Sequence, residues 1–358
     1  MRAASEVLGG AGSEMKTART PSQRGFRWPA EWEEHAGTWL TWPHNRDTWP
    51  GRLEGAARAY TEIVRALHGV ETVNLLVADE PAEKRVRAGL AGQGVQVDRL
   101  RFHRIPTDDS WIRDYGPLFL VDDRGGRLAA DFGFDAWGGK YPPWDLDAAA
   151  GRAVARAAGI DVVHCRTVLE GGALDGDGLG TVLATGRCLL DPARGPGRTR
   201  EALEALLADQ LGAREVIWLE GEIAGDDTDG HVDQLARFVA SGTVAAVPLA
   251  ETLGPLRGAR DARGRPLCVV ELPAPPQVRV DGAPVPASYA NFYLGNGVAL
   301  VPVFGVPEDE RALAVLGELL PDRQLTGIPC RDLAVGLGAI HCVTQQEPKA
   351  TSQGTRLR

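Results

Sequence analysis

The 358-residue sequence lacks the cysteine pairs, the long apolar run and the excess of positive charge that mark several large classes of protein. Its five cysteines are an odd number and none lies in a CxxC pair, so neither a disulfide framework nor a structural zinc knuckle is expected. No apolar run is long enough to span a bilayer. A net charge of −9 argues against nucleic acid and is compatible with a cationic substrate. We therefore expect a protein of the reducing cytoplasm, with neither a membrane nor a nucleic acid as partner.

The two ends of the chain are poor in the residues that build a core. The first 24 residues are small, polar and basic, without the apolar segment of a signal peptide. We predict a disordered tail over 1–25, a single domain over 26–348 and a second tail over 349–358. Met15 is the only other methionine and is an alternative start.

Segments with helical periodicity recur along the chain. Apolar residues are spaced for one face of a helix in six of them: 51–69, 81–94, 144–159, 197–212, 249–264 and 307–320. Five are followed by a short run rich in Val, Ile or Leu, typical of a strand: 95–102, 160–165, 214–219, 266–272 and 323–328. The last four helices start about 50 residues apart, which indicates a repeated α/β unit in five copies. Chance spacing is the alternative.

A segment dense in polar, glycine and aromatic residues comes after each of these strands. The five segments are 108–117, 169–178, 225–234, 287–297 and 338–346. In a pseudo-symmetric ring of five units they would all point toward one axis. Because loops on a rigid scaffold carry function, we predict a site built from these five loops.

The third of these segments reads GDDTDGHVDQ. If it is extended, Asp229, His231 and Asp233 share one face, and the two carboxylates raise the pKa of His231. Such an array can hold a metal, orient a general base or grip a cation. The sequence contains neither HxxH nor HExxH, which disfavours a metal. An exposed acidic loop after a glycine turn is the remaining interpretation.

The last segment contains adjacent His341 and Cys342. Strand alternation would put them on opposite faces, so His341 is predicted to be a bystander and not the base for Cys342. A cysteine in an apolar strand is usually a core residue, and this interpretation applies to Cys165, Cys188, Cys268 and Cys330. The glycines before Cys342 and the glutamines after it favour a site instead. A partner such as His231 would then come from another unit.

Four further residues stand out in the other segments. Trp111 and Asp114 lie in WIRDYGP, Glu170 precedes two glycines, and Asn291 lies in ASYANFYLGNG. Each alone could be a turn or cap residue. Together with a histidine, a cysteine and a second carboxylate, they describe a cation-holding pocket that contains a thiol.

Six ordered motifs resemble one known family. They are WPAEWEEHAGTWLTWPHNRDTW (28–49), WIRDYGP (111–117), EGG (170–172), DTDGHVD (227–233), ASYANFYLGNG (287–297) and GAIHCVTQQ (338–346). They are similar to those of the agmatine deiminase and bacterial peptidylarginine deiminase family of guanidino-group-modifying enzymes. The resemblance extends from about Phe26 to Pro348. It implies the α/β pentein fold, a five-bladed pseudo-symmetric propeller.

The resemblance also implies the reaction. Agmatine and water would become N-carbamoylputrescine and ammonia, as a step in putrescine and polyamine metabolism. Cys342 would be the nucleophile that forms a covalent amidino-thio intermediate, and His231 would be the general acid and base. The implied chemistry needs neither a metal nor an organic cofactor.

The remaining motif residues would bind the substrate. Asp114 and Asp233 would grip the guanidinium nitrogens, because a planar guanidinium matches carboxylates in bidentate fashion. Glu170 would help hold the guanidinium or orient His231. Trp111 and Asn291 would line the path of the substrate tail.

Two departures from the motifs leave the substrate tail open. Tyr115 follows the aspartate as in the peptidylarginine branch, and GLGA at 336–339 replaces a more glycine-rich turn. Without a secretion signal, agmatine is favoured over a peptide. An arginine or peptidylarginine deiminase, an amidinotransferase and a non-catalytic binding protein of the same fold are the alternatives. Family members are often oligomers, so a homo-oligomer is possible here.

The segment FDAWGGKYPPW, at 134–144, is rich in glycine and aromatic residues. Such a segment can close over a substrate, so it is the candidate lid. A packed hairpin on the rim is the alternative.

Overall fold

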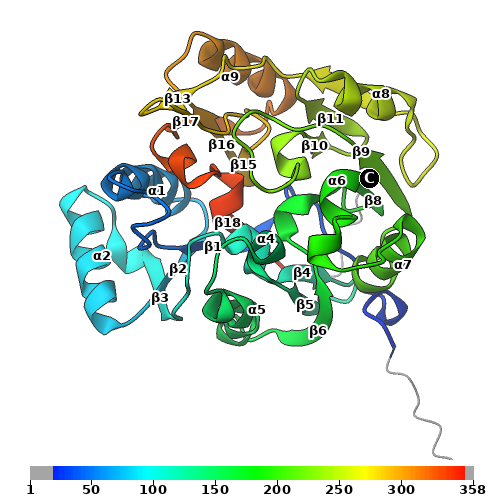
Figure 1. Cartoon of the computed structure of the whole chain (residues 1–358). Coiled ribbons are helices and arrows are strands. Elements are labelled where there is room, and N and C mark those ends of the chain that lie inside the picture. The colour runs from blue at the N-terminus through cyan, green and yellow to red at the C-terminus, as the bar shows by residue number, and fades with distance from the viewer. Residues whose placement is uncertain (1–18, 351–358) are drawn as a thin grey trace, which may run out of the picture.

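The computed structural model describes residues 19–350, which form five small mixed sheets and one two-stranded ribbon (Figure 1). In four of the sheets the first strand is antiparallel to the second, and the second is parallel to the third. These sheets are β4 (Leu118–Val121), β5 (Arg127–Gly133) and β6 (Asp161–Val168); β7 (Leu174–Gly176), β8 (Thr181–Thr185) and β9 (Glu215–Leu219); β10 (Ala236–Ala240), β11 (Thr243–Ala246) and β12 (Cys268–Glu271); and β15 (Tyr293–Gly295), β16 (Val298–Val303) and β17 (Gln324–Pro329). The ribbon is β13 (Arg279–Val280) and β14 (Ala283–Pro284).

The fifth sheet joins the two ends of the described chain. Its strand order is β18 (Thr344–Pro348), β1 (His35–Thr41), β2 (Thr72–Val77) and β3 (Leu100–Arg104). β18 runs antiparallel to β1, whereas β1, β2 and β3 are parallel. The predicted five-fold recurrence is therefore confirmed as one strand pattern repeated in five separate sheets. Over residues 19–350 these sheets are not joined into one closed sheet.

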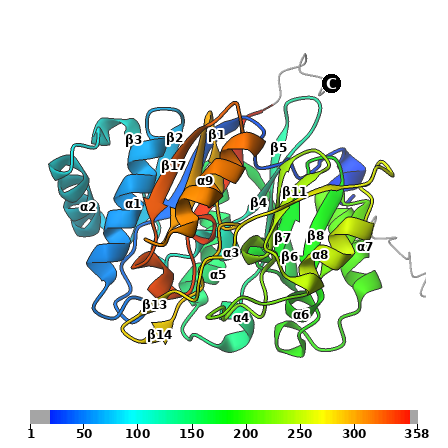
Figure 2. The same cartoon turned by 90° about the horizontal axis from the view of Figure 1, so that it is seen from above.

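The long helices connect the parallel strands and lie around the perimeter in Figure 1. They are α1 (Leu53–Leu67), α2 (Glu80–Gly92), α5 (Asp145–Ala157), α7 (Arg200–Leu211), α8 (Ala250–Gly258) and α9 (Glu308–Leu319). All six predicted helical segments are helices. The short helices are α3 (Ile112–Tyr115), α4 (Ala136–Gly139) and α6 (Gly186–Leu189). α4, α6 and the β13–β14 ribbon lie along the lower edge of Figure 2.

Local sequence explains where these helices form and what they bury. In α1, Tyr60, Ile63 and Leu67 recur at helical spacing on one face, and all three are fully buried. α2 begins after Asp79, whose side chain accepts a 2.7 Å hydrogen bond from Ala82 N. Most strands of the sheets are buried on both faces, as strands between two layers should be.

The predicted tails fall mostly outside the described part of the chain. Residues 1–18 and 351–358 lie outside it. Residues 19–25, assigned by the prediction to the first tail, are described and include a 3-10 turn at Ser22–Arg24. Lys349, at the start of the second predicted tail, donates its backbone N–H to Glu34 O at 2.8 Å. No helix among the described residues is long and apolar enough to cross a membrane.

Candidate active site

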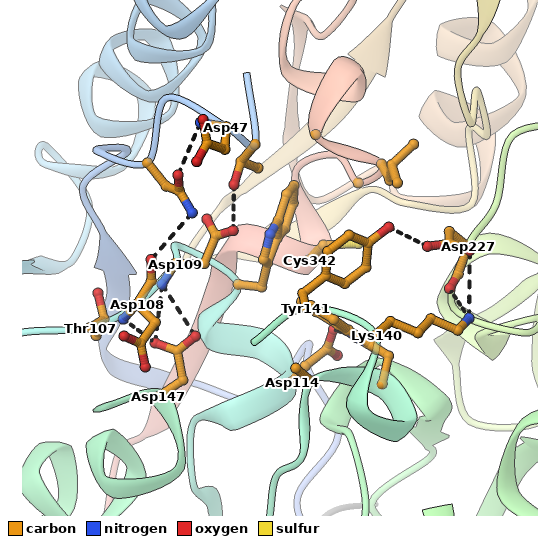
Figure 3. Close-up of a pocket in the computed structure, with 18 of the residues that line it drawn as sticks. Asp47, Thr107, Asp108, Asp109, Asp114, Lys140, Tyr141, Asp147, Asp227 and Cys342 are labelled. Carbon is orange, nitrogen blue, oxygen red and sulfur yellow. Dashed lines mark hydrogen bonds and ion pairs between the residues drawn. The ribbon is translucent and has the colours of Figure 1, made fainter. Parts of the chain in front are cut away.

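A cavity of about 1000 Å³ is lined by residues from the segments 44–50, 107–114, 136–147, 227–228 and 335–342 (Figure 3). Cys342, Asp114 and Trp111 contribute to its wall. Six aspartates line it, against one arginine and one lysine: Asp47, Asp108, Asp109, Asp114, Asp147 and Asp227, with Arg46 and Lys140. The cavity is therefore suited to a cation.

The five predicted loops meet beside this cavity. Gly172 N donates a 2.9 Å hydrogen bond to Asp114 Oδ1, and His231 Nδ1 lies 3.7 Å from the same oxygen. Asn291 Nδ2 lies 3.2 Å from Cys342 Sγ. Cys342 Sγ in turn lies 3.6 Å from Asp233 Oδ2, in the same segment as His231. Together these contacts link all five polar segments, so their predicted convergence is confirmed.

The Cys342 thiol is buried among polar partners. Its Sγ lies 3.6 Å from Asp233 Oδ2 and within hydrogen-bond reach of the amides of Asn291 and Gln234. Burial raises the pKa of Cys342 well above its usual range, and the charges of Asp233 and Asp114 add to this effect. A thiolate therefore needs a cation beside it.

The backbone around Cys342 differs from the predicted strand. His341–Val343 form a 3-10 turn, and β18 begins only at Thr344. A 3-10 turn of three residues does not have the alternation of a strand, so the argument that put His341 and Cys342 on opposite faces is wrong. His341 is buried, with Nδ1 2.7 Å from Asp233 Oδ2 and Nε2 3.0 Å from Glu31 Oε2. Because each ring nitrogen faces a carboxylate, both can donate only in the imidazolium form.

Glu31 binds the His341 ring nitrogen that does not face Asp233. It is buried and contacts Arg237 at 2.9 Å, His341 at 3.0 Å and Arg113 at 3.2 Å. Burial alone would raise the pKa of Glu31, but the charges of Arg237, His341 and Arg113 hold it well below the usual range. Sequence reasoning missed Glu31, because nothing in its local pattern separates it from nearby Glu33. Arg113, in the WIRDYGP segment, is buried as well.

Asp233 is held ionised by this network. Burial opposes ionisation, but the hydrogen bond and charge of His341 lower the pKa of Asp233 below its usual value. His341 binds Oδ2, whereas Oδ1 is buried and has no hydrogen-bond partner among residues 19–350. Asp233 therefore presents one carboxylate oxygen for a cationic donor.

Asp114 has two protein donors of its own. Besides Gly172 N on Oδ1, Trp137 Nε1 donates to Oδ2 at 3.0 Å. Burial raises the pKa of Asp114 to about 6, where the charge of His231 opposes and that of Asp233 reinforces the shift. Asp114 consequently titrates near neutral pH in the unliganded protein.

The segment around His231 is not extended, which corrects a second expectation. Asp229 has a φ of +63° and Val232–Gln234 form a 3-10 turn, so alternate side chains do not share a face. Asp229 instead binds Arg194, with Nη1 2.8 Å from Oδ2. It therefore does not join His231 and Asp233 on one face.

Glu170 lies beside His231 without a hydrogen bond to it. Arg194 Nε donates to Glu170 Oε1 at 2.7 Å. Glu170 Oε2 and His231 Nε2 are buried and have no hydrogen-bond partner within the described chain. Each keeps one unused polar atom next to the site.

The two residues expected along the substrate path take different positions. Trp111 lines the cavity and packs against Trp49, with ring centroids 5.5 Å apart. Asn291 is not among the residues that line the cavity. Its Nδ2 donates to Cys342 Sγ, and its Oδ1 accepts a hydrogen bond from His341 N at 3.0 Å. In the structure Asn291 is therefore a neighbour of the thiol, and its role along the substrate path stays a prediction.

The candidate lid, 134–144, contributes residues such as Lys140 and Tyr141 to the lining of the cavity (Figure 3). Lys140 Nζ lies 2.9 Å from Asp229 Oδ2, and Tyr141 OH donates to Asp227. The segment contains the short helix α4 and not the hairpin considered as the alternative. Trp137, at a φ of +59°, connects it to Asp114.

Comparisons with known proteins agree with one another. Residues 27–348 match the family described as Porphyromonas-type peptidyl-arginine deiminase. An agmatine deiminase of Stutzerimonas stutzeri is 34% identical, over 92% of this chain and 97% of that protein. A putative agmatine deiminase of Streptomyces avermitilis is 38% identical, over 92% and 99%. The solved agmatine deiminase of Enterococcus faecalis superposes with a TM-score of 0.85, at 32% identity over 94% of this chain and 99% of that one.

Proposed function

The chain belongs to the Porphyromonas-type peptidyl-arginine deiminase family, and on this premise we propose that it hydrolyses agmatine to N-carbamoylputrescine and ammonia. The observation that carries the proposal is the pairing of the buried Cys342 thiol with Asp233, one of whose oxygens lacks a partner among the described residues. An anionic carboxylate against a neutral thiol suits a substrate that is both a cation and an electrophile.

Guanidinium binding is the first step. Asp233 Oδ1 and the Asp114 carboxylate accept hydrogen bonds from different guanidinium nitrogens, which brings the central carbon to Cys342 Sγ. The bound cation offsets the two carboxylate charges that raise the pKa of the thiol. The thiol proton then passes to His231, so the nucleophile forms only when substrate is present.

The covalent step then takes place at the guanidinium carbon. The Cys342 sulfur bonds to this carbon, one carbon–nitrogen bond breaks, and His231 gives its proton to the departing ammonia. An amidino-thio adduct remains. Water, deprotonated by His231, then attacks the same carbon, and the sulfur leaves with its bonding electrons to release the ureido product. Glu170, which lies within 4.8 Å of His231 without a hydrogen bond to it, would hold the ring in place by its charge once the ring carries the proton.

The charge of the cavity supports agmatine over arginine. Burial raises the pKa of Asp147 to about 8, so that wall residue is largely neutral. Asp47 and Asp108 remain in the lining, against Arg46. Lys140 is already paired with Asp227 and Asp229. The lining therefore attracts the terminal ammonium of agmatine and repels the carboxylate of free arginine.

The fold proposal accompanies the function. The five sheets share one strand pattern, and the loops of all five contribute residues to one site. We infer that they are the blades of a five-bladed propeller with the site on its axis. This arrangement accounts for a catalytic set drawn from positions between 114 and 342.

Ammonia release from agmatine, arginine and a peptidylarginine tests the proposal, with wild type and Cys342→Ala. We expect turnover of agmatine alone, and none after loss of the thiol. Turnover of arginine or the peptide instead would replace the substrate. A new guanidine formed only when an amine acceptor is added would identify an amidinotransferase. No turnover of any guanidine by a folded sample would refute the deiminase function.

A further inference from the structure

A second cluster of reactive side chains lies beside His231, and it includes a cysteine that the reaction above does not use. Glu170, Cys188 and His231 each contribute one potential ligand atom, and these atoms lie within 4.8 Å of one another. Cys188 comes from α6 and is fully buried. The sequence assigned it to the core, and it does belong to a buried apolar cluster, while its sulfur also lies near two site residues.

Two atoms of this cluster are unused. Glu170 Oε1 is held by Arg194, and His231 Nδ1 is the ring nitrogen that faces Asp114. The other atom of each pair, Glu170 Oε2 and His231 Nε2, is buried without a hydrogen-bond partner in residues 19–350. Unpaired buried polar atoms are costly, so two of them beside one thiol indicate a place for a ligand.

The donor set identifies the kind of ligand. Sulfur, imidazole nitrogen and one carboxylate oxygen are the ligands of zinc, whereas calcium and magnesium prefer oxygen alone. Three protein ligands also leave the fourth tetrahedral position to a small molecule such as water.

The surrounding charges permit a cation. Arg194 is the positive group at the cluster, but it is shared between Glu170 and Asp229. Asp114, 3.7 Å from His231, lines the acidic cavity and adds a carboxylate on the other side. Burial keeps Cys188 protonated by raising its pKa well above the usual range, so metal binding would release the thiol proton.

We propose that Glu170, Cys188 and His231 form an inhibitory site for a thiophilic divalent cation, represented by Zn²⁺. An ion bound there would be coordinated by the His231 imidazole, which must carry the leaving-group proton, and by the Glu170 carboxylate beside it. The effect on turnover depends on the deiminase function proposed above. Binding of the ion does not, because Cys342 is not among its ligands.

Cobalt provides a test that needs no activity. Co²⁺ is added to a Cys342→Ser variant, which removes the other thiol of the site, and the thiolate-to-cobalt charge-transfer absorption is recorded. We expect the band in this variant and also after a further Cys330→Ala change, since Cys330 is equally buried but follows β17. A further Cys188→Ala change should abolish it. Absence of the band in Cys342→Ser, or its survival without Cys188, would overturn the proposal.

Inhibition by zinc is measured on enzyme with Cys342 intact, relative to the metal-free rate of each variant. The zinc concentration for half inhibition should rise at least about 100-fold in Cys188→Ala, because a direct ligand is lost, and by less than about 3-fold in Cys330→Ala. Equal inhibition of Cys188→Ala and wild type would assign the ion to Cys342 and refute the site. If no guanidine is turned over, the cobalt result still decides the metal proposal separately.

Discussion

Replacing His341 by glutamine tests whether this residue positions and charges Asp233. In wild type the His341 ring lies between Asp233 Oδ2 at 2.7 Å and Glu31 Oε2 at 3.0 Å. A glutamine amide can still fill the space, but it brings no charge and cannot donate in both directions at these distances. Without the imidazolium, burial dominates and the pKa of Asp233 rises.

The expected size follows from the lost interaction. A hydrogen bond to a charged group contributes about 1.5–3 kcal/mol, and this amount corresponds to a loss of about 10- to 150-fold in kcat/KM if it is fully expressed in the transition state. Glu31 keeps Arg113 and Arg237 as partners, so we do not expect the variant to unfold. Asp114 sets the acid limb of the wild-type pH profile, and in the variant Asp233 becomes a second group that must be deprotonated to bind the guanidinium. The acid limb should therefore become steeper and extend to higher pH.

The assay is ammonia release from agmatine at several pH values, with kcat and KM separated. His35→Gln is the matched control, because His35 is also buried and lies 3.3 Å from a carboxylate, that of Glu71. It should lower the melting temperature without moving the acid limb. A change in kcat/KM below about 3-fold with an unmoved acid limb in His341→Gln would refute the reasoning.

Three further predictions concern the thiol, the guanidinium carboxylate and the backbone beneath Trp111. Cys342→Ala should lower kcat by at least about 10³-fold, and mass spectrometry during turnover should detect no adduct; an adduct on the variant would contradict the assigned nucleophile. Because the neutral acid cannot pair with a cation, kcat/KM of wild type should fall as the pH drops below about 6, the pKa of Asp114. Asp114→Asn should lower kcat/KM at all pH values and remove that limb; an unchanged limb would assign it to another group. At Gly338, a Cβ would meet the Trp111 ring at 2.5 Å and Cys342 Cβ at 3.0 Å, so Gly338→Ala should reduce kcat more than it reduces the melting temperature. Gly89→Ala, where a Cβ meets nothing within 4 Å, is its control.

The repeat and the residues that carry chemistry could be predicted from local patterns. Helical periodicity in α1 and Val/Ile-rich composition in β9 reflect short-range preferences that the sequence displays directly. The polar residues after each strand stood out because a buried core is built from apolar side chains. Cys342 and Asp114 were found in this way.

The errors came from backbone geometry. Strand alternation was applied to 338–346 and to 225–234, but both contain 3-10 turns, and Asp229 adopts a positive φ. Because side-chain direction depends on φ and ψ, the neighbours of His341 and Asp229 could not be derived from spacing.

The sequence by itself determined the class of fold, the five-fold recurrence and the identities of the polar groups that meet at the site, because each depends on composition or on periods of two and 3.6 residues. Only the tertiary structure decided which of those groups touch. The link from Glu31 through His341 to Asp233 joins positions 31, 341 and 233, and the cluster of Glu170, Cys188 and His231 likewise joins separate loops. Such contacts arise from the packing of sheets against one another, where a rotation of one backbone angle moves a side chain to a different partner.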